Sequence, residues 1–357
     1  MVKIQNRVGG PVTRPGWILA LASGLMAVSS LPLLAQEQPE GASKDLLDEL
    51  KTYRHKIVHE SCRDGNWEIY LMNADGSNPL NLTRTPDIDE LYPKVSPDGR
   101  KICFQADEGK EDDKVRRLYL MDIDGGHRVK IADDAREPCW SADGKKIAYL
   151  PNEFKKFTYA DGATRGIRIY DLATQETRDH PNKEILHLYT LNWSPDGRWF
   201  VATVHGAMGY KHGILALEAE GNGVFDLGLK GCRPDLSPDG KRVAWGHGDF
   251  AMGSAELDLS GPTPKVNGIR NIVESKEFET YHVDWSPDGK YIAYSFGPKY
   301  KGKSIKGLLP EFPGVEAPGW NTCVADASQK NRWVQITFDG KSNKEPDWVF
   351  VKETPGK

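Results

Sequence analysis

A hairpin phrase recurs along the chain, and this repetition constrains the fold more than any other feature. Residues 283–294 read VDWSPDGKYIAY, where Val283 and Trp285 alternate with polar residues as in a half-buried strand. The proline and the Asp-Gly pair that follow favour a tight turn, and a second β-rich run begins at Tyr291. The phrase returns as KVSPDGRKICF (94–104), CWSADGKKIAY (139–149), NWSPDGRWFVA (192–202) and DLSPDGKRVAW (235–245).

The spacing of these hairpins indicates a propeller. Their turn serines are separated by 45, 53, 43 and 49 residues and are Ser96, Ser141, Ser194, Ser237 and Ser286. Each hairpin is followed by a third strand, such as LYLMDIDG at 118–125, and some repeats add a short fourth strand, such as LNLT at 80–83. A period of 40 to 50 residues with four strands per copy is typical of propeller blades. Almost no helical periodicity separates the strands, so we expect an all-β fold.

The two ends of the repeat region predict how the ring closes. The first repeat begins at Lys56 with KIVHES, which matches the second strand of the phrase but lacks the first. The last segment, EPDWVF at 345–350, matches the first strand and lacks the turn. Together the two ends complete one blade, which leaves no open sheet edge. We therefore predict a six-bladed β-propeller over 56–352, closed by pairing of N- and C-terminal strands.

The sequence before the propeller resembles an export signal. Residues 1–35 combine three basic residues (Lys3, Arg7 and Arg14) with an apolar core at 17–28 and a small-residue ending before Gln36. We expect cleavage near residue 35, a periplasmic or secreted protein, and no stable membrane insertion afterwards. The alternative is an uncleaved membrane anchor, because 17–34 is near spanning length. Residues 36–55 then supply a linker and a short amphipathic helix with Ser43 as its N-cap.

Composition limits the classes of partner. The chain of 357 residues has a formal net charge of −4 and 38% hydrophobic residues, which suffices for a large core. No basic stripe with interleaved aromatic residues is present, so nucleic-acid binding is not expected. We expect a monomer.

The phrase W-S-P-D-G-K-x-I-A-Y, followed by I-Y-x-M-D-x-D-G and a terminal L-T, resembles the TolB-like (WD40-like, PD40) repeat of exported bacterial proteins. The resemblance implies a six-bladed ring that binds partners or ligands without obligatory catalysis. TolB itself carries a further N-terminal α/β domain, where this sequence predicts only a short helix. Similar repeats occur in prolyl-oligopeptidase relatives and in oligogalacturonate lyases. No G-x-S-x-G elbow with a following hydrolase domain is found, which argues against the peptidase class.

Loop variation predicts the binding face. The first turn of every hairpin is uniform, whereas the connections at the other end of the blades differ in length, at 107–115, 151–165, 204–212, 247–252 and 296–320. Loops on a rigid scaffold commonly carry function. We therefore expect an envelope protein, or a small or oligosaccharide ligand, to bind on this variable-loop face. The basic segment 296–320 could cover the channel or contact an acidic partner; the alternative is a solvated loop.

Polar residues on the first strand of each blade form a second candidate site. They alternate with apolar residues, so they should point toward the central channel, where water or an ion can satisfy them. Mutual hydrogen bonds across the ring are the structural alternative to ligand binding. The candidate ligand-binding residues are Lys94, Glu137, Thr190, Arg233, His282, Asp284 and Glu345.

Histidines support an alternative function. His205, His247 and His282 lie near the same ends of consecutive repeats, and imidazoles there could hold a divalent metal. Oligogalacturonate lyases resemble this arrangement in having a histidine-bound metal in a propeller. The alternative is thus a metal-assisted polysaccharide-processing enzyme, with Arg233 or Lys94 holding an acidic sugar. The leading hypothesis is a binding protein without catalytic residues or cofactor. Under this hypothesis the histidines are scattered on the surface and bind no metal.

Overall fold

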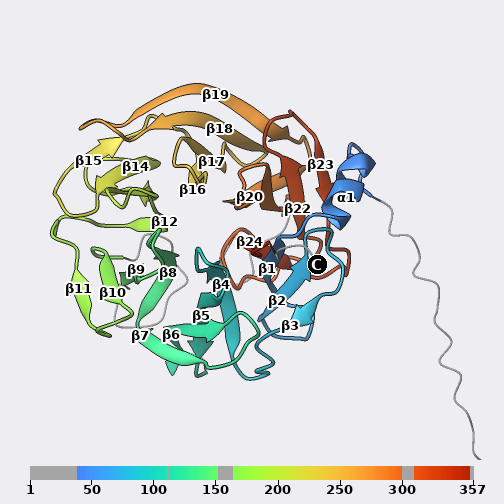
Figure 1. Ribbon diagram of the computed structural model, residues 1–357, viewed down its shortest axis with the longest axis horizontal. Coiled ribbons are helices and arrows are strands. Elements are labelled where there is room, and N and C mark those ends of the chain that lie inside the picture. The colour runs from blue at the N-terminus through green and yellow to red at the C-terminus, as the bar shows by residue number, and fades with distance from the viewer. Residues whose placement is uncertain (1–37, 111–112, 152–163, 300–308, 354–357) are drawn as a thin grey trace, which may run out of the picture. The chain divides into compact units, whose positions relative to one another are not determined.

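The computed structural model describes residues 38–110, 113–151, 164–299 and 309–353, which form six four-stranded antiparallel sheets arranged as a ring (Figure 1). The innermost strands are β24 (Asn343–Val349), β4 (Asp89–Val95), β8 (Ala135–Trp140), β12 (Leu188–Trp193), β16 (Cys232–Leu236) and β20 (Phe278–Trp285). The second strands are β1 (Lys56–Ser61), β5 (Lys101–Glu108), β9 (Lys146–Pro151), β13 (Trp199–His205), β17 (Arg242–Gly246) and β21 (Tyr291–Pro298).

The third strands are β2 (Glu68–Asn73), β6 (Val115–Asp122), β10 (Arg168–Asp171), β14 (His212–Glu218), β18 (Ala251–Asp258) and β22 (Asn321–Asp326). The outer strands are β3 (Leu80–Asn81), β7 (Val129–Asp133), β11 (Thr177–Asp179), β15 (Val224–Asp226), β19 (Lys265–Glu274) and β23 (Trp333–Gln335). We number the blades 1 to 6 in the order of their second strands. The predicted all-β six-bladed propeller is confirmed.

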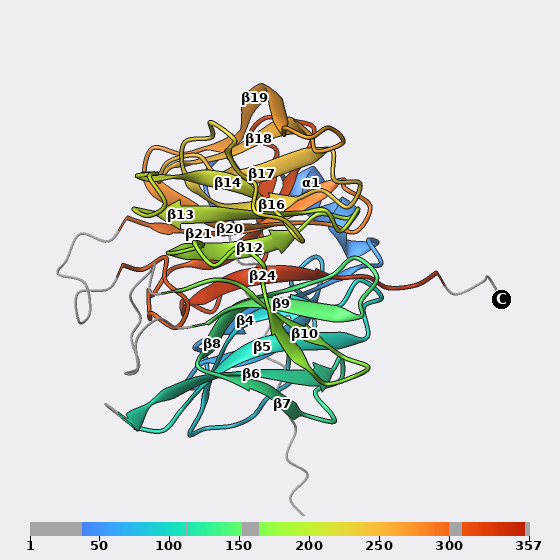
Figure 2. The same ribbon diagram turned by 90° about the vertical axis from the view of Figure 1, so that its left-hand side faces the viewer.

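The ring is closed by strands from both ends of the chain. In blade 1 the order is β24-β1-β2-β3, and Ile57 pairs with Trp348 across the junction. The red β24 lies beside the blue β1 in Figure 1, and Figure 2 shows the blades edge-on. Every residue of β24 is buried. The predicted closure is therefore confirmed, and β24 belongs to the centre of the ring rather than to its edge.

The repeated turn has the same hydrogen bonds in each hairpin. In the first copy, the Gly99 amide donates to the Ser96 carbonyl (2.8 Å), and the Lys101 amide donates to Ser96 Oγ (2.9 Å). Gly99 adopts φ +73°, a left-handed conformation that glycine reaches at little cost. The serine, aspartate and glycine are thus fixed by local geometry. These turns form one end of the ring, which we call the turn face.

The predicted helix is present as α1 (Lys44–Lys51), with Leu46 and Leu50 buried. It packs beside blade 6, where Arg332 bridges Asp45 (2.7 Å) and Glu49. Ser43 occupies the N-cap position, but its side chain makes no capping hydrogen bond; its amide donates to the Trp333 carbonyl instead (2.7 Å). Docking on the sheet therefore replaces part of the capping that the sequence predicted.

No helix in the described ranges has the length and apolar character that crossing a bilayer would require. The proposed signal segment 1–35 lies outside the described residues, as do residues 300–308 of the basic loop.

Candidate functional site

Each innermost strand contains one residue with left-handed backbone at the same position of the repeat. The pairing register with the second strand shifts at these points, which marks a β-bulge. Non-glycine residues rarely adopt positive φ, so six such positions indicate a conformation imposed by the ring. These residues, here called the bulge ring, have φ between 48° and 56° and are Tyr92, Glu137, Thr190, Arg233, His282 and Glu345.

Hydrogen bonds from neighbouring blades hold the bulge ring in place. The Tyr92 amide donates to Glu60 Oε2 (3.0 Å), and the Arg233 amide donates to Thr203 Oγ1 (2.9 Å). Likewise the Glu137 amide donates to Gln105 (2.7 Å), and the Thr190 amide donates to Glu137. The backbone amide of each of these four residues, which makes no hydrogen bond within its own sheet at the bulge, therefore donates to a side chain of the preceding blade.

Glu345, His282 and Arg233 form a buried polar group within the bulge ring. Glu345 Oε1 lies 3.0 Å from His282 Nε2 and 3.7 Å from Arg233 Nη1. His282 Nδ1 contacts Ser295 Oγ (2.8 Å), and its Nε2 donates to the Glu311 carbonyl (2.7 Å). Burial, reinforced by Arg233, lowers the pKa of His282, so the neutral imidazole is favoured. Both ring nitrogens of His282 are therefore engaged by protein groups.

Two residues further along each innermost strand lies a second ring, closer to the turn face. We call it the mouth ring; its members are Lys94, Cys139, Asn192, Asp235, Asp284 and Asp347. Lys94 Nζ lies 2.7 Å from Asp347 Oδ1 and 3.5 Å from Asp284 Oδ1. Two carboxylates and one ammonium from three consecutive blades therefore meet.

The aspartates of the mouth ring also join neighbouring blades. Asp235 accepts from the Trp285 amide (2.8 Å), and Asp284 accepts from the Trp348 amide (2.8 Å). Burial raises the pKa of Asp235 to about 6, although Lys94 opposes the shift. Burial and the neighbouring Asp347 carboxylate raise the pKa of Asp284 well above its ordinary value. Asp284 is therefore protonated more readily than an exposed aspartate, and a cationic ligand would oppose this shift.

The mouth ring is the floor of a hollow of about 470 Å³ on the turn face, here called the funnel. Its walls are turn prolines and aromatic residues that also pack between blades, as Trp285 does against Ala244. The two rings enclose a smaller space of about 10 Å³, roughly the room for one water. The wall residues include Pro97, Trp140, Trp193, Pro195, Pro238, Trp285, Pro287, Trp348 and Phe350.

The opposite end of the channel is filled by residues 309–317, which we call the plug. The ammonium of Lys344 is fully buried and donates to the carbonyls of Pro310 (3.0 Å), Phe312 (2.6 Å) and Val315 (2.8 Å). The Gly314 amide donates to Glu60 Oε1 (3.2 Å). The described part of the loop 296–320 therefore covers the channel, which is one of the two roles expected for this loop from the sequence. At the other end, among the described residues, the turn face opens into the funnel.

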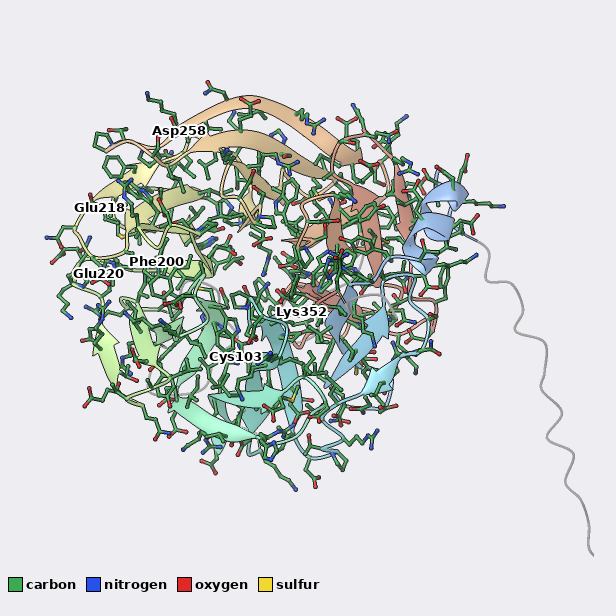
Figure 3. The ribbon with its side chains drawn as sticks, viewed as in Figure 1. Cys103, Phe200, Glu218, Glu220, Asp258 and Lys352 are labelled. Carbon is green, nitrogen blue, oxygen red and sulfur yellow. The ribbon has the colours of Figure 1, made fainter. Side chains whose placement is uncertain are left out.

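A larger hollow of about 640 Å³ lies between blades 4 and 5. Its polar groups are largely engaged by local turns: Ser194 Oγ donates to Asp196 (2.6 Å), and Ser260 Oγ donates to Asp258 (2.6 Å). In Figure 3, Asp258, Glu218 and Glu220 lie toward the outside of the ring. We favour the funnel because it combines apolar walls with buried carboxylates.

The three candidate metal ligands are not brought together. His282 is buried in the bulge ring, and His247 Nδ1 contacts Asn271 Oδ1 (2.7 Å) in blade 5. His205 is exposed beside His212. Within the described ranges, no group of three or more His, Cys, Asp or Glu side chains is placed to hold one metal ion.

Sequence reasoning missed Glu60 and Lys344, although both are buried at the channel. Lys344 could have been found from the sequence because it directly precedes Glu345 in the last, incomplete copy of the repeat. Of the seven residues proposed from the sequence, five belong to the bulge ring and two, Lys94 and Asp284, to the mouth ring.

Glu345 should make stability depend on pH. Burial raises its pKa to about 8, so the folded chain keeps a proton that the unfolded chain releases above about pH 4.5. The free energy of unfolding should therefore fall as pH rises from about 4.5 to about 8. In Glu345→Gln, we expect the free energy of unfolding to fall less between pH 5 and pH 8 than in the unsubstituted chain. Urea unfolding at pH 5, 6, 7 and 8 measures this. Parallel profiles for the two chains would contradict a protonated Glu345.

Comparisons with known proteins agree with this architecture. A TolB structure from Acinetobacter baumannii superimposes with a TM-score of 0.62 at 18% identity, covering 83% of this chain and 66% of that one. The TolB homolog of Chlorobaculum tepidum is 38% identical over 77 residues, 21% of this chain and 16% of that protein. An uncharacterized protein of Agrobacterium fabrum is 31% identical over 104 residues, 26% of this chain and 35% of that protein.

No family model matches the chain. The chain spans about a third or less of the length of these two curated relatives. The fold is a TolB-like six-bladed β-propeller.

Proposed function

We propose that this propeller is an exported, non-catalytic binding protein that takes up an extended segment of a partner protein in the funnel. The observation that carries the proposal is the contrast between the two ends of the channel. The plug occupies the variable-loop end, whereas the turn face opens into a hollow of about 470 Å³. The TolB-like fold supports a partner-binding role, and the pattern of residues 1–35 supports export to the periplasm or beyond.

The chemistry of the funnel suits a peptide. Tryptophan and proline walls offer apolar area, which peptide side chains can bury. The Asp235, Asp284 and Asp347 carboxylates at the floor can accept hydrogen bonds from backbone amides or from a basic side chain. The same floor disfavours an acidic sugar, because Lys94 is already paired with two carboxylates. The metal-assisted enzyme remains the second hypothesis, and the separate positions of its three histidines do not favour it.

Filling the funnel should abolish binding without disturbing the fold. Ala142 is exposed in a turn at the funnel mouth, so Ala142→Trp should obstruct entry. The matched control is Ala173→Trp, at an exposed turn between β10 and β11. Peptides selected from a displayed library on the unsubstituted chain should bind Ala142→Trp at least ten-fold more weakly and Ala173→Trp equally. Affinity is measured by the change in tryptophan fluorescence, with calorimetry as confirmation.

Two results would contradict the proposal. Selected peptides that bind both variants with the affinity of the unsubstituted chain would place their site elsewhere. A selection that yields no peptide binding in solution would exclude peptide segments as the ligand class.

A further inference from the structure

Two exposed imidazoles face each other at the variable-loop end of blade 4. β13 ends at His205 and β14 begins at His212, and these two residues are direct partners in the strand pairing. Their Nδ1 atoms lie 3.3 Å apart in a hydrogen-bond contact, in which one ring donates to the other, and the ring planes are nearly perpendicular, at 89°. Both side chains are exposed, so an ion from solution can reach them. The funnel is at the other end of the ring, so this pair is independent of the proposed peptide site.

The backbone holds the two imidazoles in position. The Gly206 amide donates to the Lys211 carbonyl and so ties the two strand ends together. The His205 amide donates to the His187 carbonyl (3.0 Å), which anchors β13 to the segment before β12. The Tyr189 ring lies 6.4 Å from the His205 ring and 6.3 Å from the His212 ring. The backbone of both residues is therefore already in place for the two rings to bind one ion.

The separation of the nitrogens matches that of two ligands on one metal. For a zinc–nitrogen bond of about 2.05 Å, nitrogens 3.3 Å apart subtend about 107° at the ion, close to the tetrahedral angle. Neutral imidazole is a preferred ligand for Zn²⁺, Cu²⁺ and Ni²⁺. We propose that His205 and His212 form a two-histidine site for a divalent transition-metal ion of this class.

Such an ion would keep coordination positions for other donors. Within the described residues, no third His, Cys, Asp or Glu joins the pair to complete a cluster. The remaining positions would be taken by water or by a donor atom of a bound molecule, as the one open position of a catalytic zinc site is. Of the three histidines suggested as ligands by the sequence, only His205 belongs to this site. Its partner is His212, not His247 or His282.

The test uses the untagged chain titrated with Zn²⁺ and Ni²⁺ by calorimetry in a non-coordinating buffer. We expect one ion per chain, with affinity reduced at least ten-fold in both His205→Ala and His212→Ala. The matched control is His247→Ala, which should bind as the unsubstituted chain does. Cu²⁺ added at one equivalent should give an electron paramagnetic resonance spectrum with hyperfine splitting from two nitrogens, reduced to one in either single variant.

Both substitutions are at an exposed strand end, so unchanged melting temperatures without metal should show that the variants fold. The inference is overturned if the unsubstituted chain binds none of these ions. It is also overturned if His247→Ala removes binding while the two blade 4 variants retain it. Binding that survives in all three variants would likewise place the ion elsewhere and refute the assignment.

Discussion

Removal of β24 is expected to abolish cooperative unfolding of the propeller. A chain ending at residue 340 would lose a strand whose seven residues are all buried, including Trp348 and Val349. Fully burying one large apolar side chain contributes about 1.5–3 kcal/mol. Domains as a whole are stable by only about 5–15 kcal/mol. The same truncation removes Lys344 and Asp347 from the channel and exposes the inner edge of β1.

The measurement is urea unfolding followed by near-ultraviolet circular dichroism. The truncated chain should show no cooperative transition and should lose the signal of its packed aromatic residues. Adding a peptide of residues 341–353 in excess should restore part of the transition, because the peptide can reoccupy the place of β24. A truncated chain that unfolds cooperatively at the original midpoint would mean that blade 1 does not need its innermost strand.

The sequence predicts this closure because the relevant signals are local. Alternation in VDWSPDGKYIAY, together with the turn chemistry of Pro287, Asp288 and Gly289, fixes one hairpin. Its repetition fixes the period, and the incomplete copies at the two ends fix the blade count. None of these steps requires knowledge of contacts between distant residues.

The details of the site depend on contacts between blades, which no local pattern encodes. Thr190 is a β-branched residue in left-handed conformation, and its amide is held by Glu137 of the preceding blade. The sequence therefore places the polar residues on the channel side but does not separate them into two rings. The sequence likewise did not indicate that the loop 296–320 returns part of its own backbone, residues 309–317, into the channel, and binding on the variable-loop face stays a prediction.

Similarly, the pairing of His205 with His212 depends on the length of one hairpin. The two residues flank the hairpin between β13 and β14, and the register of these strands brings their nitrogens to 3.3 Å. His247 follows the end of the second strand of blade 5, a position comparable to that of His205, but contacts Asn271. His282 lies on an innermost strand and contacts Ser295. Equivalent places in a repeat therefore do not imply a shared ligand.

Replacing Lys344 by methionine should lower the free energy of unfolding by about 3–5 kcal/mol, the usual consequence of removing one partner from a buried charged group. The ammonium satisfies the carbonyls of Pro310, Phe312 and Val315, and it lies 3.9 Å from Glu60. Burial lowers its pKa to about 8, with Glu60 opposing the shift, so near neutral pH the charged form still donates. Methionine has a similar length but no donor, so three buried carbonyls would lose their partner.

Urea unfolding at pH 7 measures this loss, and Lys341→Met, at an exposed position three residues earlier, is the matched control. Hydrogen exchange gives a second readout, because the Gly314 amide in the plug donates to Glu60 and should exchange faster once Lys344 is gone. A loss below about 1 kcal/mol, the size of one ordinary hydrogen bond, would show that the plug is held mainly by its apolar contacts. If unfolding and exchange both change as expected, the buried ammonium of Lys344 holds the plug in the channel.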